Sequence, residues 1–106
     1  MAVPPKPPAR YVEFATRFPE LAQAWELSAK AGKDGPLDER TARLVKLAVA
    51  IGAMREGAAH ASVRKALAMG IEPEALEQVV ALGAGTLGMP STVAAWGWVR
   101  DLLPGD

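Results

Sequence analysis

The sequence predicts an all-helical protein, and three observations support that prediction. Hydrophobic residues form 50% of the 106-residue chain and aromatic residues only 6%, so the apolar content is mainly Ala, Leu and Val, which suits close helix packing. Apolar residues recur at helical spacing in segments that prolines and glycines separate. No segment shows the alternation of β-branched residues that is typical of strands. We therefore expect a bundle of about six helices.

The start of the chain divides into an arm and two short helices. Residues 1–9 are rich in proline, which fixes φ and removes an amide donor, so we predict an extended N-terminal arm there. Residues 10–106 are expected to form a single helical domain. Its first helices are predicted at Arg10–Arg17 and Pro19–Lys30, the second with proline in its first turn.

The third helix has the clearest pattern. Asp38 is a good N-cap residue, and an apolar stripe at helical spacing follows it. The stripe consists of Leu44, Leu47, Ala48 and Ile51, and Val45, Val49 and Ala50 widen it. A helix with so broad an apolar surface is predicted to be nearly enclosed.

Three further helices are expected in the second half of the chain. One runs from about Glu56 to Met69 and ends at Gly70, because glycine adopts the left-handed conformation that closes helices. Pro73 opens the next helix at its first turn. The final helix starts near Met89-Pro90-Ser91 and is closed by Pro104-Gly105.

Charge and composition exclude several classes of function. Twelve basic and twelve acidic residues cancel, which argues against a nucleic-acid partner. The chain contains no cysteine, which excludes a disulfide framework and thiol catalysis and fits a reducing compartment. The longest apolar run, Leu44–Met54, contains Lys46 and falls well short of the roughly 20 residues that span a bilayer. We therefore expect a cytoplasmic protein without a membrane partner.

Glu56 and His60 form the one constellation that could do chemistry. His60 is the only histidine, and it follows Glu56 by one helical turn, so the two side chains lie within roughly 40° of each other on the helix. Val63 and Leu67 fall on the same stripe, so the pair is expected to face a core, a pocket or a subunit interface. A partly buried pair of this kind can hold or move a proton near neutral pH.

Three interpretations of the pair stay open. It is a structural hydrogen bond or ion pair, or an acid–base site in which His60 moves a proton and Glu56 orients it, or a metal site. The metal interpretation requires ligands from several subunits, because two ligands are too few for a closed site. The catalytic interpretation needs no cofactor. We predict that four further residues contact the substrate: Ser62, Arg64, Met89 and Ser91. The alternative role of Met89 is to fill a gap in the core, and that of Ser91 is to cap a helix.

Two longer segments and one turn resemble the carboxymuconolactone decarboxylase family, which includes the AhpD-like alkylhydroperoxidases. The segments are Leu37–Ala50 and Val63–Leu76, and Gly88-Met89-Pro90-Ser91 resembles the Gly-x-Pro turn of such sequences. The resemblance implies an AhpD-like helical fold that is built into a homo-oligomer, a trimer or a hexamer.

The resemblance also implies where functional residues would lie. The Cys-x-x-Cys-x-x-x-His motif of AhpD-like peroxidases falls on Arg55, Ala58 and Ser62, so thiol peroxidase activity is chemically excluded. Ser62 also occupies the place of the histidine in the decarboxylases. We therefore predict a small-molecule acid–base enzyme that uses Glu56 and His60, with decarboxylase- or isomerase-like or cysteine-independent peroxide-related chemistry. The alternative is a non-catalytic oligomeric binding protein.

Overall fold

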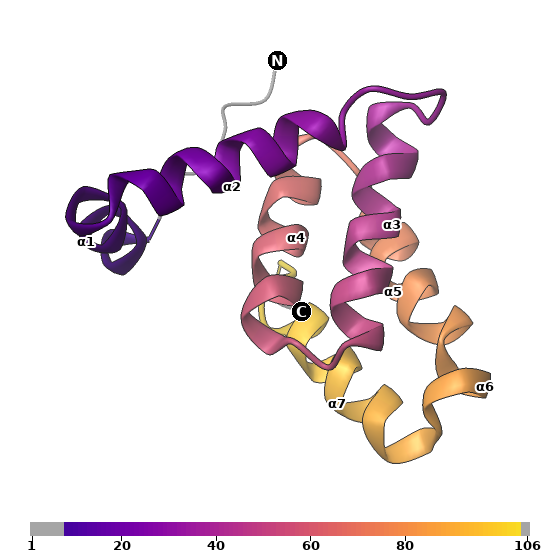
Figure 1. Cartoon of the computed structure of the whole chain (residues 1–106). Coiled ribbons are helices and arrows are strands. Elements are labelled where there is room, and N and C mark those ends of the chain that lie inside the picture. The colour runs from indigo at the N-terminus through magenta and orange to yellow at the C-terminus, as the bar shows by residue number, and fades with distance from the viewer. Residues whose placement is uncertain (1–7, 105–106) are drawn as a thin grey trace. The chain divides into compact units, whose positions relative to one another are not determined.

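The computed structural model describes residues 8–104, and every regular element within them is a helix (Figure 1). The all-helical prediction is therefore confirmed. Almost all of the predicted proline-rich arm lies outside the described residues. The contacts group the described chain into two units, residues 8–37 and residues 38–104, which we describe separately.

The first unit is a pair of helices, α1 (Ala9–Arg17) and α2 (Pro19–Ala31). Both agree with the predicted boundaries to within one residue. The rings of Phe14 and Phe18 lie 5.1 Å apart where the helices join. Neither helix contains a buried residue, so this unit has no core of its own.

The second unit begins with two neighbouring helices, α3 (Glu39–Gly52) and α4 (Glu56–Ala68). The Asp38 carboxylate accepts a hydrogen bond from the backbone N–H of Thr41 at 2.7 Å, as expected of an N-cap residue. This bond lowers the pKa of Asp38, because it stabilises the ionised carboxylate. The predicted start of α3 is thereby confirmed.

Three helices complete the unit: α5 (Pro73–Leu82), the single turn α6 (Ala84–Leu87) and α7 (Met89–Arg100). The described residues thus form seven helices where about six were predicted, because the short α6 was not expected. Gly88 has φ +82° between α6 and α7, a conformation that glycine adopts without strain. This glycine lets the chain turn directly from one helix into the next.

The core of the second unit lies where α3, α4, α5 and α7 meet. Helix α4 packs against α3 on one side and against α7 on another, and α5 contacts both α3 and α7. Fully buried side chains of α4 fill the space between them, those of Ala59, Val63 and Ala66. The small alanines allow the close approach of neighbouring helices. Helix α4 therefore presents one face to the core and two flanks to its neighbours.

The predicted enclosure of α3 is wrong for this chain. Leu47 is completely buried, but Val45 is 46% and Val49 65% exposed. The apolar surface of α3 is wider than the face that α4 and α5 cover, so part of it stays open. No helix in residues 8–104 combines the length and the apolar character that a membrane crossing requires.

Candidate functional site

His60 lies on the flank of α4 that faces α7 and is hydrogen-bonded there. Its Nε2 atom is 3.1 Å from Oδ2 of Asp101, the residue that caps the C-terminus of α7. The His60 side chain is 23% exposed and that of Asp101 58%. An ionised carboxylate only accepts hydrogen bonds, so Nε2 carries the donated proton. In the neutral ring, Nδ1 is then left as an acceptor.

Glu56 lies in the first turn of α4 and is exposed. Within residues 8–104 no hydrogen bond or ion pair joins Glu56 to His60. The structure therefore joins His60 to a carboxylate from another helix, although Glu56 lies one turn away on α4. The catalytic role assigned to Glu56 stays a prediction.

Sequence reasoning missed Asp101. A negative charge at the C-terminal end of a helix is opposed by the helix dipole, which favours cations there. Asp101 occupies such a position, next to Arg100. An acid in this unfavourable place was a signal that a partner with a proton to donate lies nearby, and His60 is that partner.

Of the other four predicted contact residues, only Arg64 shares the flank of α4 that carries His60. Arg64 is half-buried and follows His60 by one turn of α4, so it shares that flank. Ser62 is only 7% exposed. Met89 and Ser91 lie in the first turn of α7, about 18 and 15 Å along that helix from Asp101 at 1.5 Å per residue. Helix capping by Ser91 is not observed either, because α7 starts at Met89 without a side-chain cap.

Arg100 fixes the end of α7 that carries Asp101. Its Nη1 atom lies 3.4 Å from Oε2 of Glu77 on α5, and both side chains are about one-third exposed, at 35% and 30%. The Arg100 guanidinium also lies 5.9 Å from the centre of the Trp96 ring. Trp96 belongs to α7 itself, so the ion pair with Glu77 is the contact that ties the last turn of α7 to α5. This ion pair therefore limits the positions that Asp101 can take beside His60.

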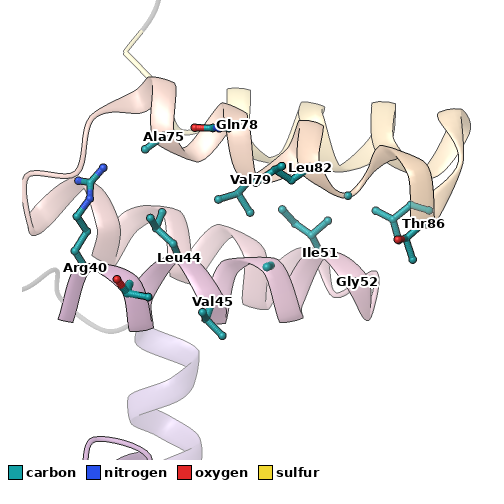
Figure 2. A pocket seen from close by; sticks show the side chains of 14 residues that line it. Arg40, Leu44, Val45, Ile51, Gly52, Ala75, Gln78, Val79, Leu82 and Thr86 are labelled. Carbon is teal, nitrogen blue, oxygen red and sulfur yellow. The ribbon is translucent and has the colours of Figure 1, made fainter. Parts of the chain in front are cut away.

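A second feature is an apolar groove of about 520 Å³ between α3 and the segment formed by α5 and α6. Figure 2 shows Leu44 and Ile51 on one wall facing Val79 and Leu82 on the other, with Arg40 at one end. The volume lies in the range of small-molecule pockets. None of the predicted site residues lines this groove, so it is separate from His60.

Arg40 closes its end of the groove with an ion pair. Its guanidinium donates to both carboxylate oxygens of Glu72, from Nη1 to Oε2 at 3.3 Å and from Nη2 to Oε1. The hydrogen bond raises the pKa of Arg40 and lowers the pKa of Glu72, because each charge stabilises the other. This end of the groove therefore carries two opposite charges that cancel.

The described residues contain no group of three or more His, Cys, Asp or Glu side chains that could hold a metal ion. His60 and Asp101 supply two ligand types suited to zinc, whereas a catalytic zinc site has three protein ligands. A metal at this position would therefore require ligands from other subunits.

Comparison with known proteins places the chain in a family. The sequence model of the carboxymuconolactone decarboxylase family matches residues 19–101. No curated protein and no solved structure matches the chain significantly. The matched range covers most of the sequence and includes the whole of α4. The chain belongs to the carboxymuconolactone decarboxylase family.

Proposed function

We propose that this family member is an acid–base enzyme that moves a proton on a small carbonyl or carboxylate compound, in decarboxylase- or isomerase-like chemistry or in peroxide-related chemistry without cysteine. One observation carries the proposal: His60 is hydrogen-bonded to a carboxylate while its ring stays partly accessible. A histidine oriented in this way is the commonest general base in enzymes.

In the proposed reaction, Nδ1 of His60 accepts the proton of the substrate. Asp101 accepts the Nε2–H bond, holds the ring in the tautomer that leaves Nδ1 free, and stabilises the imidazolium that forms. Arg64, one turn later on the same flank, would bind a carboxylate of the substrate. Asp101 acts through His60 and is therefore a positioning residue.

The experiment is a turnover screen of the purified full chain against small lactones, β-keto acids and organic hydroperoxides. On any substrate that is turned over, we expect His60→Gln to lower kcat/KM about 100- to 10,000-fold, the usual contribution of general acid–base catalysis. Glu56→Gln is the matched control, because Glu56 is exposed and lies one turn away. Unchanged turnover by His60→Gln would defeat the proposal.

A loss of kcat/KM with Glu56→Gln as large as with His60→Gln would instead return the orienting role to Glu56.

Metal analysis of the purified protein tests the interpretation of Glu56 and His60 as metal ligands. Stoichiometric zinc, iron or manganese that is lost with His60→Gln would assign His60 to a metal site shared between subunits. The proton-transfer proposal expects neither bound metal nor a thermal shift when these metals are added.

The second candidate function is a non-catalytic oligomeric protein, and the open apolar surface favours it. Leu82 at the groove is 74% exposed, and α7 presents three apolar side chains at helical spacing, Met89, Val93 and Trp96. Surfaces of this kind are usually covered by another subunit. We propose that a second copy of the chain fills the groove, because its exposed rim continues over Val45 onto the open side of α3.

Oligomerisation accompanies both candidate functions, and a trimer or hexamer is proposed from the family resemblance. Light scattering at micromolar concentration is expected to give a mass several times that of the chain. Leu82→Glu should lower that mass, because a charge in a closed apolar interface is costly. A wild-type monomer would contradict the proposal.

A cytoplasmic location is also proposed, on the absence of cysteine.

A further inference from the structure

Three basic side chains on α3 and α4 form a group that we call the cationic cluster: Arg43, Lys46 and Lys65. Arg43 and Lys46 are three residues apart on α3, so they share one side of that helix. Lys65 lies on α4, which packs against α3. Its pKa is lowered by burial and further by nearby positive charges, those of Arg43, Lys46 and Arg64. The cluster therefore spans the junction of the two helices.

No ion pair among the described residues joins an acidic side chain to the cluster. The ion pairs within residues 8–104 involve other basic groups, those of Arg10, Arg40, His60 and Arg100. The Nε atom of Arg43 is buried and has no hydrogen-bond partner in the described part of the chain. Burial also lowers the pKa of Arg43, because it removes part of the charged guanidinium from water. A half-buried guanidinium without a partner is costly, and proteins usually supply one.

We propose that the cationic cluster binds a small oxyanion, a carboxylate or a phosphate. The guanidinium of Arg43 offers directed N–H donors, and the two ammonium groups add charge without fixed geometry. Ser62 precedes Lys65 by three residues, so its hydroxyl shares that side of α4 and is a further donor. An oxyanion at this junction would accept hydrogen bonds from the Nη groups of Arg43 and cancel the repulsion among the cations.

This site is separate from the proposed proton-transfer site. Lys65 follows His60 by five residues, which places the two side chains about 140° apart around α4. His60 faces α7, whereas Lys65 lies on the side of α4 that is near Arg43 and Lys46 of α3. The two proposals can therefore fail independently.

The test is a titration of the full chain with sodium phosphate and, separately, with sodium succinate, followed by calorimetry and thermal unfolding. Sodium chloride at equal ionic strength is the reference, because it reproduces screening without oxyanion chemistry. We expect at least one oxyanion to raise the melting temperature beyond the chloride reference, by mass action on the folded state. The stronger of the two identifies the oxyanion class.

Variants locate the binding. We expect Arg43→Gln to raise the Kd about tenfold, since it removes the directed donors, and Lys46→Gln or Lys65→Gln about threefold, since each removes charge alone. The two lysines are exposed, so their variants should fold even where Arg43→Gln does not. Lys33→Gln, an exposed lysine in the other unit, is the matched control and should bind as the wild type does.

Two outcomes would overturn the proposal. One is a thermal shift with phosphate and succinate that does not exceed that with chloride. The other is oxyanion binding that the three cluster variants leave unchanged. A third outcome is a lower oligomer mass of Lys65→Gln together with no oxyanion binding by the wild type. It would show that a carboxylate of a second copy compensates the cluster, and it would also overturn the proposal.

Discussion

On the flank of α4 that faces α7, His60 is hydrogen-bonded to Asp101 at 3.1 Å. On the flank that faces α3, Lys65 lies near other cations and has no acidic partner within residues 8–104. Both flanks belong to one helix of 13 residues and are held by the same core. On the first flank, the charged partner of His60 is a side chain of the same chain. On the second flank, the cations require an anion from outside the described residues. We therefore assign proton transfer to the first flank and oxyanion binding to the second.

The largest effect is expected from breaking the core that holds both flanks. Leu47 is completely buried on α3, so Leu47→Ala should lower the free energy of unfolding by about 2–5 kcal/mol through lost burial and a residual cavity. Chemical unfolding measures the loss. Gln23→Ala on α2 is the control, because the replacement of an exposed residue outside the groove should cost less than about 0.5 kcal/mol. Equal losses for the two variants would show that the core does not lie where α3 and α4 meet.

A smaller effect is expected from breaking the pair on the first flank. Asp101→Ala removes the acceptor of the His60 Nε2–H bond and should destabilise the protein by no more than about 1 kcal/mol, because Asp101 is 58% exposed. As His60 is the only histidine, its ring nitrogens give unambiguous NMR signals. We expect Asp101→Ala to shift the Nε2 signal and Glu56→Ala to leave it in place. The reverse result would mean that Glu56 holds the ring.

On the flank of α4 that carries Lys65, we expect a substitution to stabilise the protein instead of destabilising it. Lys65→Gln relieves an uncompensated charge, so it should raise the free energy of unfolding in the absence of oxyanions, by at most about 0.5 kcal/mol given its exposure. Lys33→Gln is again the control.

The stabilisation by Lys65→Gln is expected to depend on pH, because the pKa of Lys65 is lowered in the folded protein. The folded state holds this proton less tightly than the unfolded state, so the penalty is full below the folded pKa. It disappears as the pH rises from there toward the ordinary lysine value of about 10.4. The gain from Lys65→Gln should therefore shrink over that alkaline range, and a constant gain would contradict the cause.

Local signals predicted most of the helices and only part of the site. The Asp38 cap, the prolines at helix starts and the spacing of Leu44, Leu47 and Ile51 depend on neighbours along the chain, and the structure bears them out. The single turn α6 was missed, because glycines weaken helical patterns without excluding one turn. The enclosure of α3 was overestimated, because the pattern shows that a face is apolar but not which helix covers it.

The partner of His60 could not be read from helix spacing. Glu56 is close along the chain, but α7 brings Asp101 to His60 across 41 residues of sequence. The same holds for the cationic cluster, which combines α3 and α4 and becomes visible only once their packing is known. Tertiary packing, and not residue type, decided both groupings.

The most direct test of the proposed proton-transfer site is a double-mutant cycle of His60→Gln and Asp101→Asn, measured as kcat/KM on any substrate that the wild type turns over. We expect the double variant to be about as slow as His60→Gln alone, because Asp101 acts only through the ring that His60 supplies. Losses that multiply would show that Asp101 acts independently of His60. An Asp101→Asn variant as active as the wild type would contradict its role altogether.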